Sequence, residues 1–283
     1  MARHTWLITG SSRGFGHAVT KAALEAGDNV VATARRPEQL AEFADTYGDR
    51  VRTVALDITD PEAARAAVAT ALEAFGSLDV VANIAGRASS ASIEDMDPED
   101  FRAQIETNLF GLVNVTRAAL PHMRTRRAGH FLQFSSIGGR VGGTPGMGAY
   151  QTAKYGVEGF SQVLNTEVVP LGIKVTIVEP AAFRTDWGGS SMTIQEPGPD
   201  YASSVGEMHA YRRDHAGKEP GDPARAARVL IDIVNNPEPP LRLLLGADAV
   251  AIAEKASKER AAEAALWADV SRSTAFADED AAA

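Results

Sequence analysis

The chain has 283 residues, of which 45% are hydrophobic and 23% charged, so it can bury the core of one large domain or two small ones. It contains no cysteine, which excludes disulfides, thiolate metal sites and cysteine nucleophiles and favours a cytoplasmic location. The net charge of −9 argues against nucleic acid or an acidic membrane surface as a partner, and no apolar run approaches the roughly 18 residues of a membrane span.

The first predicted elements are a short β-rich strand at 5–9, a glycine-rich turn, and a helical pattern that stops at Gly27. Glycines 10, 14 and 16 allow the backbone to turn tightly and to approach phosphate groups, whose charge the helix N-terminus then meets. Strand, glycine turn and helix in this order form the front of a dinucleotide-binding unit. The glycine spacing differs from the G-x-G-x-x-G fingerprint, so the turn alone is weak evidence.

Strand and helix patterns then alternate along the chain. The predicted strands are 29–33, 51–56, 78–83, 130–135, 173–178 and 241–245, and the predicted helices are 37–47, 61–75, 101–123, 148–169 and 223–235. Short, continuously apolar strands that alternate with helices indicate a parallel sheet covered on both faces. We therefore predict an α/β, doubly wound fold of the Rossmann type, with seven mostly parallel strands in one domain at residues 1–246.

Two segments depart from this alternation. Residues 186–220 are rich in Gly, Ser and Pro, and a long irregular stretch in a compact domain is usually functional, so we predict a mobile substrate-binding lid over an apolar pocket. The alternative is a short helical excursion that only packs. The apolar lid residues and the candidate hinges are Trp187, Met192, Ile194, Tyr201, Val205, Met208, Tyr211, Gly188, Gly189 and Gly206. Residues 247–283 are predicted to form a C-terminal helical extension, helical to about Trp267 and solvated or at an interface.

Tyr150 and Lys154 lie four residues apart in the predicted helix 148–169, which places both side chains on one face. A phenol beside an ammonium is a plausible acid/base pair, because the cation favours the phenolate and is expected to lower the Tyr150 pKa from about 10 towards the working pH. The same spacing arises by chance in many helices, so the pair requires a cofactor site and a carbonyl-binding partner elsewhere in the chain.

Those partners are present, and with them the chain resembles the short-chain dehydrogenase/reductase family over almost its whole length. The matching pieces are Thr9-Gly10-xxx-Gly14-x-Gly16, Asp57-Ile58, Asn83-Ile-Ala-Gly86, Asn108, Ser135-Ser136, Tyr150-xxx-Lys154, and Pro180 followed by Thr185. Within the family, the arginine-rich second turn and the C-terminal extension are similar to NADP-preferring enzymes related to hydroxysteroid and retinol dehydrogenases.

The resemblance implies four catalytic residues. Tyr150 would be the general acid in carbonyl reduction and the base in the reverse direction, and Lys154 would hold the nicotinamide ribose and lower the Tyr150 pKa. Ser136 would donate a hydrogen bond to the substrate oxygen. Asn108 would bind a water that relays protons towards Lys154. The alternatives are a strand-end turn for Ser136 and an exposed helix face for Asn108.

The resemblance also implies a nicotinamide cofactor site. No metal site is predicted, because His17, His122 and His130 have no partners at metal-ligand spacing. Asp57 would hydrogen-bond adenine, unless it is only a turn carboxylate before Pro61, and Thr185 would contact the nicotinamide carboxamide. The full set of implied cofactor-binding residues is Gly10, Ser12, Arg13, Gly14, Phe15, Gly16, Arg35, Arg36, Asp57, Ile58, Asn83, Ala85, Gly86, Tyr150, Lys154, Pro180, Phe183 and Thr185.

Three departures from the family pattern affect this site. Ile84 replaces an asparagine, which removes one side-chain tie from the loop after the fourth strand. Ala181 follows Pro180 where a glycine is usual, which stiffens the backbone near the nicotinamide. Ser136 and Tyr150 are 14 positions apart, one more than the commonest spacing, so Ser135 stays an alternative catalytic serine.

The end of the second predicted strand indicates NADP(H) as the cofactor. An enzyme that prefers NAD places Asp or Glu there to accept from the ribose hydroxyls, and that carboxylate would repel the 2′-phosphate of NADP. This chain has Ala34 followed by Arg35 and Arg36, with Arg13 nearby in the glycine turn. Guanidinium groups bind phosphate with two parallel hydrogen bonds, so the three arginines predict a phosphate site. The alternative is that Arg35 and Arg36 are solvated loop charges.

The leading hypothesis is an NADP(H)-dependent oxidoreductase that acts on a ketone, an aldehyde or a secondary alcohol, with a largely apolar substrate. The alternatives are a non-catalytic NADP(H)-binding regulator, which would usually lose Tyr150 or Lys154, and an epimerase or dehydratase, which would usually carry a larger substrate domain. Relatives commonly assemble through the long fourth and fifth helices, so a homodimer or homotetramer is expected.

Overall fold

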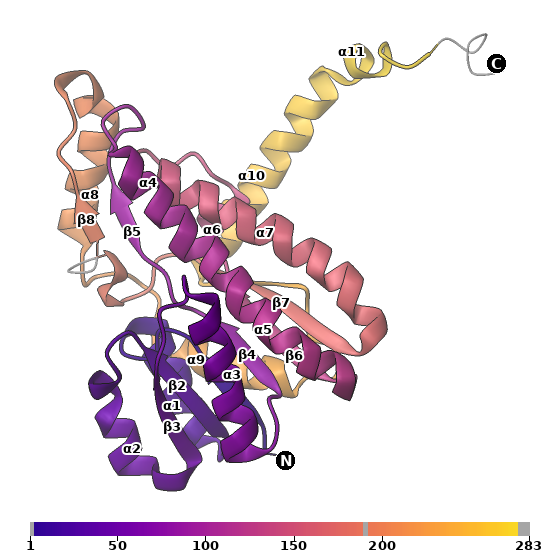
Figure 1. Cartoon of the computed structure of the whole chain (residues 1–283). Helices are drawn as coiled ribbons and strands as arrows, with labels where there is room; N and C mark the ends of the chain where they lie inside the picture. Colours follow the sequence, from indigo (N-terminus) through magenta and orange to yellow (C-terminus); the bar gives the residue numbers. More distant parts are fainter. Residues whose placement is uncertain (1–2, 189–191, 277–283) are drawn as a thin grey trace.

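A computed structural model describes residues 3–188 and 192–276, and its centre is one sheet of seven strands (Figure 1). The strands run in the order β3-β2-β1-β4-β6-β7-β9, and every pairing between neighbours is parallel. They are β1 (Thr5–Ile8), β2 (Asn29–Ala34), β3 (Val51–Ala55), β4 (Val80–Asn83), β6 (Gly129–Phe134), β7 (Ile173–Pro180) and β9 (Arg242–Leu245). The predicted α/β, doubly wound fold of seven strands is confirmed.

Helices connect these strands and begin where local sequence favours a helix start. Pro61, Pro98 and Pro223 each occupy the first turn, and the aspartate before each proline accepts a backbone N–H of that turn, which offsets the unpaired donors of a helix start. The main helices are α1 (Gly14–Glu25), α2 (Ala41–Tyr47), α3 (Pro61–Phe75), α4 (Pro98–Ile105), α5 (Gly111–Arg126), α6 (Ile137–Arg140), α7 (Gly148–Val168) and α9 (Pro223–Asn235).

Side chains on successive strand positions enter two separate cores, one on each face of the sheet. Trp6 and Ile8 pack with α1, α2 and α9 on one face, whereas Leu7 packs with α3, α5 and α7 on the other. Both faces are therefore covered, as a parallel sheet requires. The core on the first face reaches the last residues of β2, β6 and β9, which are Ala34, Phe134 and Leu245. In folds of this kind, ligands bind in the crevice outside the carboxyl ends of the strands.

Residues 186–220 are more regular than the sequence predicts. Three residues of this segment form β8 (Met192–Ile194), which pairs in parallel with β5 (Ala88–Ser90) as a separate two-stranded ribbon. The segment then forms α8 (Glu207–His215), so a helical excursion is part of it (Figure 1). Candidate hinge Gly189 lies outside the described residues. The mobility of the segment stays a prediction.

The chain after β9 forms α10 (Ala247–Leu266) and the short α11 (Ala268–Arg272), as expected for the C-terminal extension. The start of α10 contacts α6 and β9, and the helix then projects away from the body of the molecule (Figure 1). None of the described helices combines the length and the apolar composition that crossing a bilayer would require.

Candidate active site

The glycine turn after β1 is shaped for close approach of a ligand to the backbone. Gly10 and Gly14 have φ angles of 73° and 55°, which side chains other than glycine rarely adopt. A Cβ on Gly16 would overlap the Gly10 carbonyl, so the start of α1 can pack against the turn only with glycine there. The turn thus presents backbone N–H groups and a helix N-terminus without obstructing side chains, which fits the diphosphate of a dinucleotide.

Thr9 holds the neighbouring loop after β4, a role that the sequence did not reveal. Its hydroxyl accepts hydrogen bonds from the backbone N–H groups of Ile84 and Ala85, at 2.9 and 3.0 Å. The loop side-chain tie expected to be lost at Ile84 is therefore replaced by a tie to the backbone. A Cβ on Gly10 would lie 3.0 Å from the Ala85 Cα, so the two loops nearly touch.

Asn83 and Ile58, both predicted to bind the cofactor, have buried side chains. The Asn83 amide is buried and donates to Thr116 and Gln133, at 3.0 and 2.9 Å, so it joins β4 to α5 and β6. Ile58 is also buried and packs against Gly111. The Asn83 side-chain oxygen has no hydrogen-bond partner, and the cofactor contacts of both residues stay a prediction.

The end of β2 carries exposed positive charge. Arg13, Arg35 and Arg36 are all exposed, and Ala34 is buried without placing a carboxylate at the strand end. Asp57 is exposed and accepts from the backbone N–H and the hydroxyl of Thr59, which lower its pKa together with the nearby Arg35. Asp57 is thus a turn carboxylate that also remains open to a ligand.

Tyr150 and Lys154 lie on α7 as predicted, and both are buried, with the Lys154 ammonium 5.6 Å from the centre of the Tyr150 ring. The expected lowering of the Tyr150 pKa is not observed. Burial raises the pKa of Tyr150 to about 12, against the opposing effect of the Ser136 hydroxyl. Burial also lowers the pKa of Lys154 to about 8. Lys154 donates its hydrogen bond to the Phe134 carbonyl at 2.7 Å. Burial of the phenol is thus the reason for the difference from the expected pKa.

The two adjacent serines have different surroundings. The Ser135 hydroxyl is buried and directed to the Lys154 carbonyl, 3.5 Å away. Ser136 is partly exposed, caps the start of α6 by accepting from the Gly138 N–H at 3.1 Å, and lies close enough to Tyr150 to act on its pKa. Of the two, Ser136 is the serine that the fold brings to the phenol.

Asn108 lies in a π-helical turn, Glu106–Phe110, between α4 and α5, and it is buried. Its side-chain amide donates to the carbonyls of Arg87 and Gln104, and its oxygen accepts from the Arg87 N–H, at 2.8, 2.9 and 3.0 Å. A π-helical turn leaves main-chain groups without their usual partners, and such turns are frequent at functional sites. Asn108 thus fixes the loop beyond Gly86, and the exposed-face alternative is wrong.

The segment after β7 covers Tyr150 and reaches the glycine turn. The Trp187 and Tyr150 rings lie 5.0 Å apart between centres, and Met192 is buried in the same cluster as Tyr150. Thr185 lies against Gly14, and Phe183 packs on Phe15 at 4.9 Å. Pro180 ends β7 at the base of this segment.

Other aromatic lid residues face outward. Tyr211 is 57% exposed and stacks on His215, and the Tyr201 hydroxyl donates to Glu94 at 2.7 Å. Neither tyrosine belongs to the apolar cluster around Tyr150, and the predicted lid over an apolar pocket stays a prediction.

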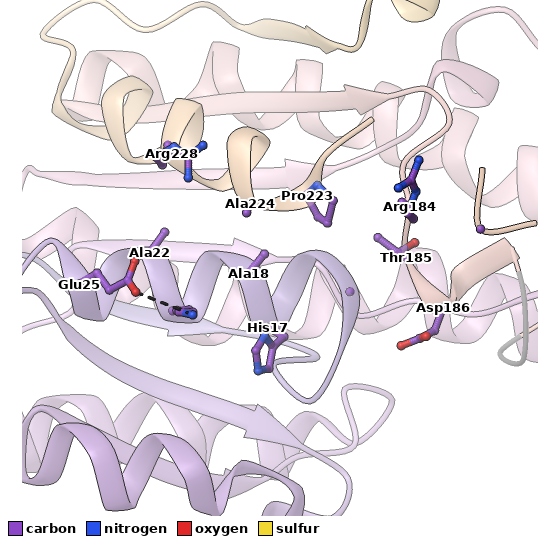
Figure 2. Close-up of a pocket in the computed structure, with 13 residues that line it drawn as sticks. His17, Ala18, Ala22, Glu25, Arg184, Thr185, Asp186, Pro223, Ala224 and Arg228 are labelled. Atoms are coloured by element: carbon purple, nitrogen blue, oxygen red, sulfur yellow. Dashed lines mark ion pairs between the residues drawn. The ribbon is translucent and has the colours of Figure 1, made fainter. Parts of the chain in front are cut away.

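A groove of about 810 Å³ lies between α1 and α9 (Figure 2). It ends at Gly14, Thr185 and Asp186, so it adjoins the dinucleotide site and lies apart from Tyr150. Its charged groups are largely used within the protein, for example in the ion pair of Lys21 and Glu25 at 3.9 Å. Tyr150 and Lys154 are not among the residues that line this groove.

A Rossmann-type sheet with a glycine cradle, and a buried Tyr-Lys pair beside a serine, define an oxidoreductase of the dinucleotide-binding class. Residues 4–195 match the family model described as short chain dehydrogenase, and the chain belongs to this family.

Three relatives illustrate the likeness. The chain is 47% identical over 271 residues to "Oxidoreductase BOA17" of Botryotinia fuckeliana, covering 95% of this chain and 98% of the relative. A crystal structure of a short-chain dehydrogenase from Streptomyces avermitilis is 40% identical, with a TM-score of 0.90 over 97% of this chain and 100% of that one. A 3-ketoacyl-(acyl-carrier-protein) reductase from Brucella melitensis, complexed with NADH, is 25% identical, with a TM-score of 0.70 over 85% of this chain and 96% of that one.

Proposed function

We propose that this protein is an NADP(H)-dependent oxidoreductase that interconverts a ketone or aldehyde and the corresponding alcohol, with Tyr150 as the general acid and base. The observation that carries the proposal is the convergence of Tyr150, Lys154 and Ser136 at the carboxyl edge of the sheet, next to a glycine cradle that fits a dinucleotide. Nicotinamide, when bound, supplies or accepts the hydride.

The protein groups have distinct tasks in carbonyl reduction. The pKa of Tyr150, raised to about 12, keeps the phenol protonated at neutral pH, so it holds the proton that the developing alkoxide requires. The Ser136 hydroxyl is free to donate to the substrate oxygen, and Lys154 places a positive charge beneath the phenol ring. In alcohol oxidation the phenolate must form, and the positive charge of Lys154 near the phenol ring favours it.

Cofactor choice rests on the end of β2. Exposed Arg35 and Arg36, with Arg13 across the turn, can bind the 2′-phosphate, and Ala34 offers no carboxylate to repel it. The Brucella reductase was crystallised as a complex with NADH, so a protein of this fold can bind that cofactor. The three arginines support NADP(H) for this chain. The same arginines are the reason for placing the protein in an NADP-preferring branch of the family.

The surroundings of Tyr150 support an apolar substrate and a homo-oligomer. Met147, Met192 and Trp187 supply apolar surface beside the phenol. Phe110, in the π-helical turn just before α5, and Val163, on α7, are 49% and 59% exposed. Their exposure supports assembly as a homodimer or homotetramer through the helices α5 and α7. The lack of cysteine supports a cytoplasmic location.

The test is a panel of ketones and aldehydes offered to the purified protein with NADPH, followed by the loss of NADPH absorbance. We expect turnover with at least one apolar carbonyl compound. Tight NADPH binding without turnover on a broad panel would instead support the non-catalytic regulator.

A further inference from the structure

Behind the active site, five charged side chains lie close together and join four elements of the fold. Lys154 and Glu158 follow each other by one turn on α7, Glu179 precedes Pro180 on β7, Arg140 ends α6, and Arg242 begins β9. Of these groups the two glutamates and Lys154 are buried. Burial of so many charges is costly unless each has a partner, so a charge without a full partner in this group indicates a specific role.

Arg242 is shared between the two carboxylates. Its Nε lies 3.2 Å from Glu158 Oε2 and 3.4 Å from Glu179 Oε1. Glu179 has a second partner in Arg140, whose Nη1 lies 3.2 and 3.3 Å from its two oxygens. Glu158 has no second cation of this kind among the described residues, and its Oε1 is buried without a hydrogen-bond partner. Arg242 therefore neutralises Glu158 only in part.

Lys154 is the group that benefits from this uncompensated charge. Its ammonium is buried, and its hydrogen bond goes to a neutral carbonyl, Phe134 O, at 2.7 Å. On its own helix, the Glu158 carboxylate acts on it through charge, and the Tyr150 ring centre lies 5.6 Å away. Arg242 pairs with both Glu158 and Glu179, and Arg140 pairs with Glu179. Burial lowers the pKa of Lys154 to about 8, and Glu158 opposes that effect.

We propose that Glu158 is a positioning residue for the reaction, which acts through Lys154 by keeping its buried ammonium charged, and that Arg242 sets how strongly Glu158 does so. The inference rests on the proposed function, because it assigns Lys154 a role in that reaction. The ion pairs among Arg140, Glu179, Arg242 and Glu158 also join α6 to β7, β9 and α7. Since Ser136 caps α6 and Lys154 lies on α7, the same ion pairs fix the positions of this serine and this lysine relative to each other.

The test is the Glu158→Gln variant, which keeps the side-chain shape and removes the charge. Without the carboxylate the Lys154 pKa falls further, so the alkaline fall of kcat for carbonyl reduction should move to lower pH by roughly one unit. At pH 8 we expect a loss of about fivefold, recovered near pH 6.5, with the substrate KM changed less than about twofold. Glu158→Asp should restore part of the shift.

The matched control is Glu167→Gln, an exposed glutamate on the same helix, which should leave the pH profile unchanged. A purely structural role for Glu158 predicts a lower melting temperature with an unmoved alkaline limb, and that result would overturn the proposal. If Glu158→Gln does not fold, Arg242→Gln serves instead. This variant removes the cation that neutralises Glu158, so the alkaline fall of kcat should move to higher pH. A shift to lower pH, or no shift, would contradict the proposed role of Glu158.

A second measurement separates this inference from the proposed function. The chain has six lysines, so the ¹⁵N-labelled Lys154 ammonium can be followed by NMR and assigned with Lys154→Arg. Its titration should shift downward in Glu158→Gln whether or not a substrate is known. A protein that turns over no carbonyl compound would refute the proposed function, whereas an unchanged Lys154 titration would refute the role of Glu158.

Discussion

The cofactor prediction can be tested by exchanging charge at the end of β2. The perturbation is Ala34→Asp combined with Arg35→Ala, which removes one guanidinium and adds the carboxylate that favours a free ribose. A hydrogen bond to a charged group contributes about 1.5–3 kcal/mol, and because Arg35 is exposed to water we take the lower end, about tenfold in affinity for NADPH. Repulsion between the new carboxylate and the 2′-phosphate should add about another tenfold.

The assay is kcat/KM with NADPH and with NADH for both proteins. We expect wild type to prefer NADPH. In the double variant, the ratio of kcat/KM with NADPH to kcat/KM with NADH should fall by about a hundredfold. Ala34 is buried, so Arg35→Ala alone is measured as well, and melting temperatures show whether the aspartate disturbs the fold.

The control is Arg225→Ala, which removes an exposed arginine on α9. It should leave kcat/KM with NADPH and with NADH unchanged. Rising salt should weaken the wild-type preference, because the Debye length falls from about 10 Å at 0.1 M to about 3 Å at 1 M. Equal use of NADH and NADPH by wild type would refute this interpretation of the arginines.

Four further predictions follow from the site and its supports. Tyr150→Phe should lower kcat on the order of a hundredfold or more and leave NADPH affinity nearly unchanged, and near-wild-type turnover would remove Tyr150 from the chemistry. Gly86→Ala would place a Cβ 2.6 Å from Asn108 Oδ1, so the free energy of unfolding from thermal melts should fall by an amount on the order of 1–3 kcal/mol. An unchanged melting temperature would contradict this close approach. Residues 186–220 should resist proteolytic nicking once cofactor and substrate are bound, whereas equal nicking with and without them counts against a lid. Burial raises the pKa of Glu179 from 4.5 to about 7, so the unfolded chain releases this proton at lower pH than the folded protein, and the free energy of unfolding should fall as pH rises between those values. In Glu179→Gln, the difference in melting temperature between pH 5 and pH 8 should be smaller than in wild type.

The sequence predicts the large elements well because their signals are local. The start prolines and the apolar periodicity of α3 and α9 place both helices at the predicted residues, and the glycine turn depends on φ angles that a sequence can indicate. The Tyr-Lys spacing likewise predicts its helix and its shared face.

What the sequence could not indicate depends on packing between distant segments. The Tyr150 pKa is set by burial under residues that come more than thirty positions later, such as Trp187 and Met192. Asn83 turns inward because Thr116 and Gln133 meet it there, which no local pattern reveals. The three residues of β5, Ala-Ser-Ser, carry no apolar strand pattern, so that strand was missed.

The pairing of β5 with β8 has a consequence for the order in which the molecule folds. Ala88 pairs with Met192, more than a hundred positions later, whereas β1 and β2 pair across about a quarter of that separation. Each doubling of a closed loop costs about 0.6 kcal/mol, and a ribbon with three residues in each strand has few hydrogen bonds to offset that cost.

We therefore expect the ribbon to form last in folding and to open first in the native state. In hydrogen exchange, its amides should lose protection in a separate, low-energy opening that leaves the seven-stranded sheet intact. Since Ala88 and Met192 pack beside Tyr150, that opening would give solvent and ligands access to the phenol without unfolding the sheet.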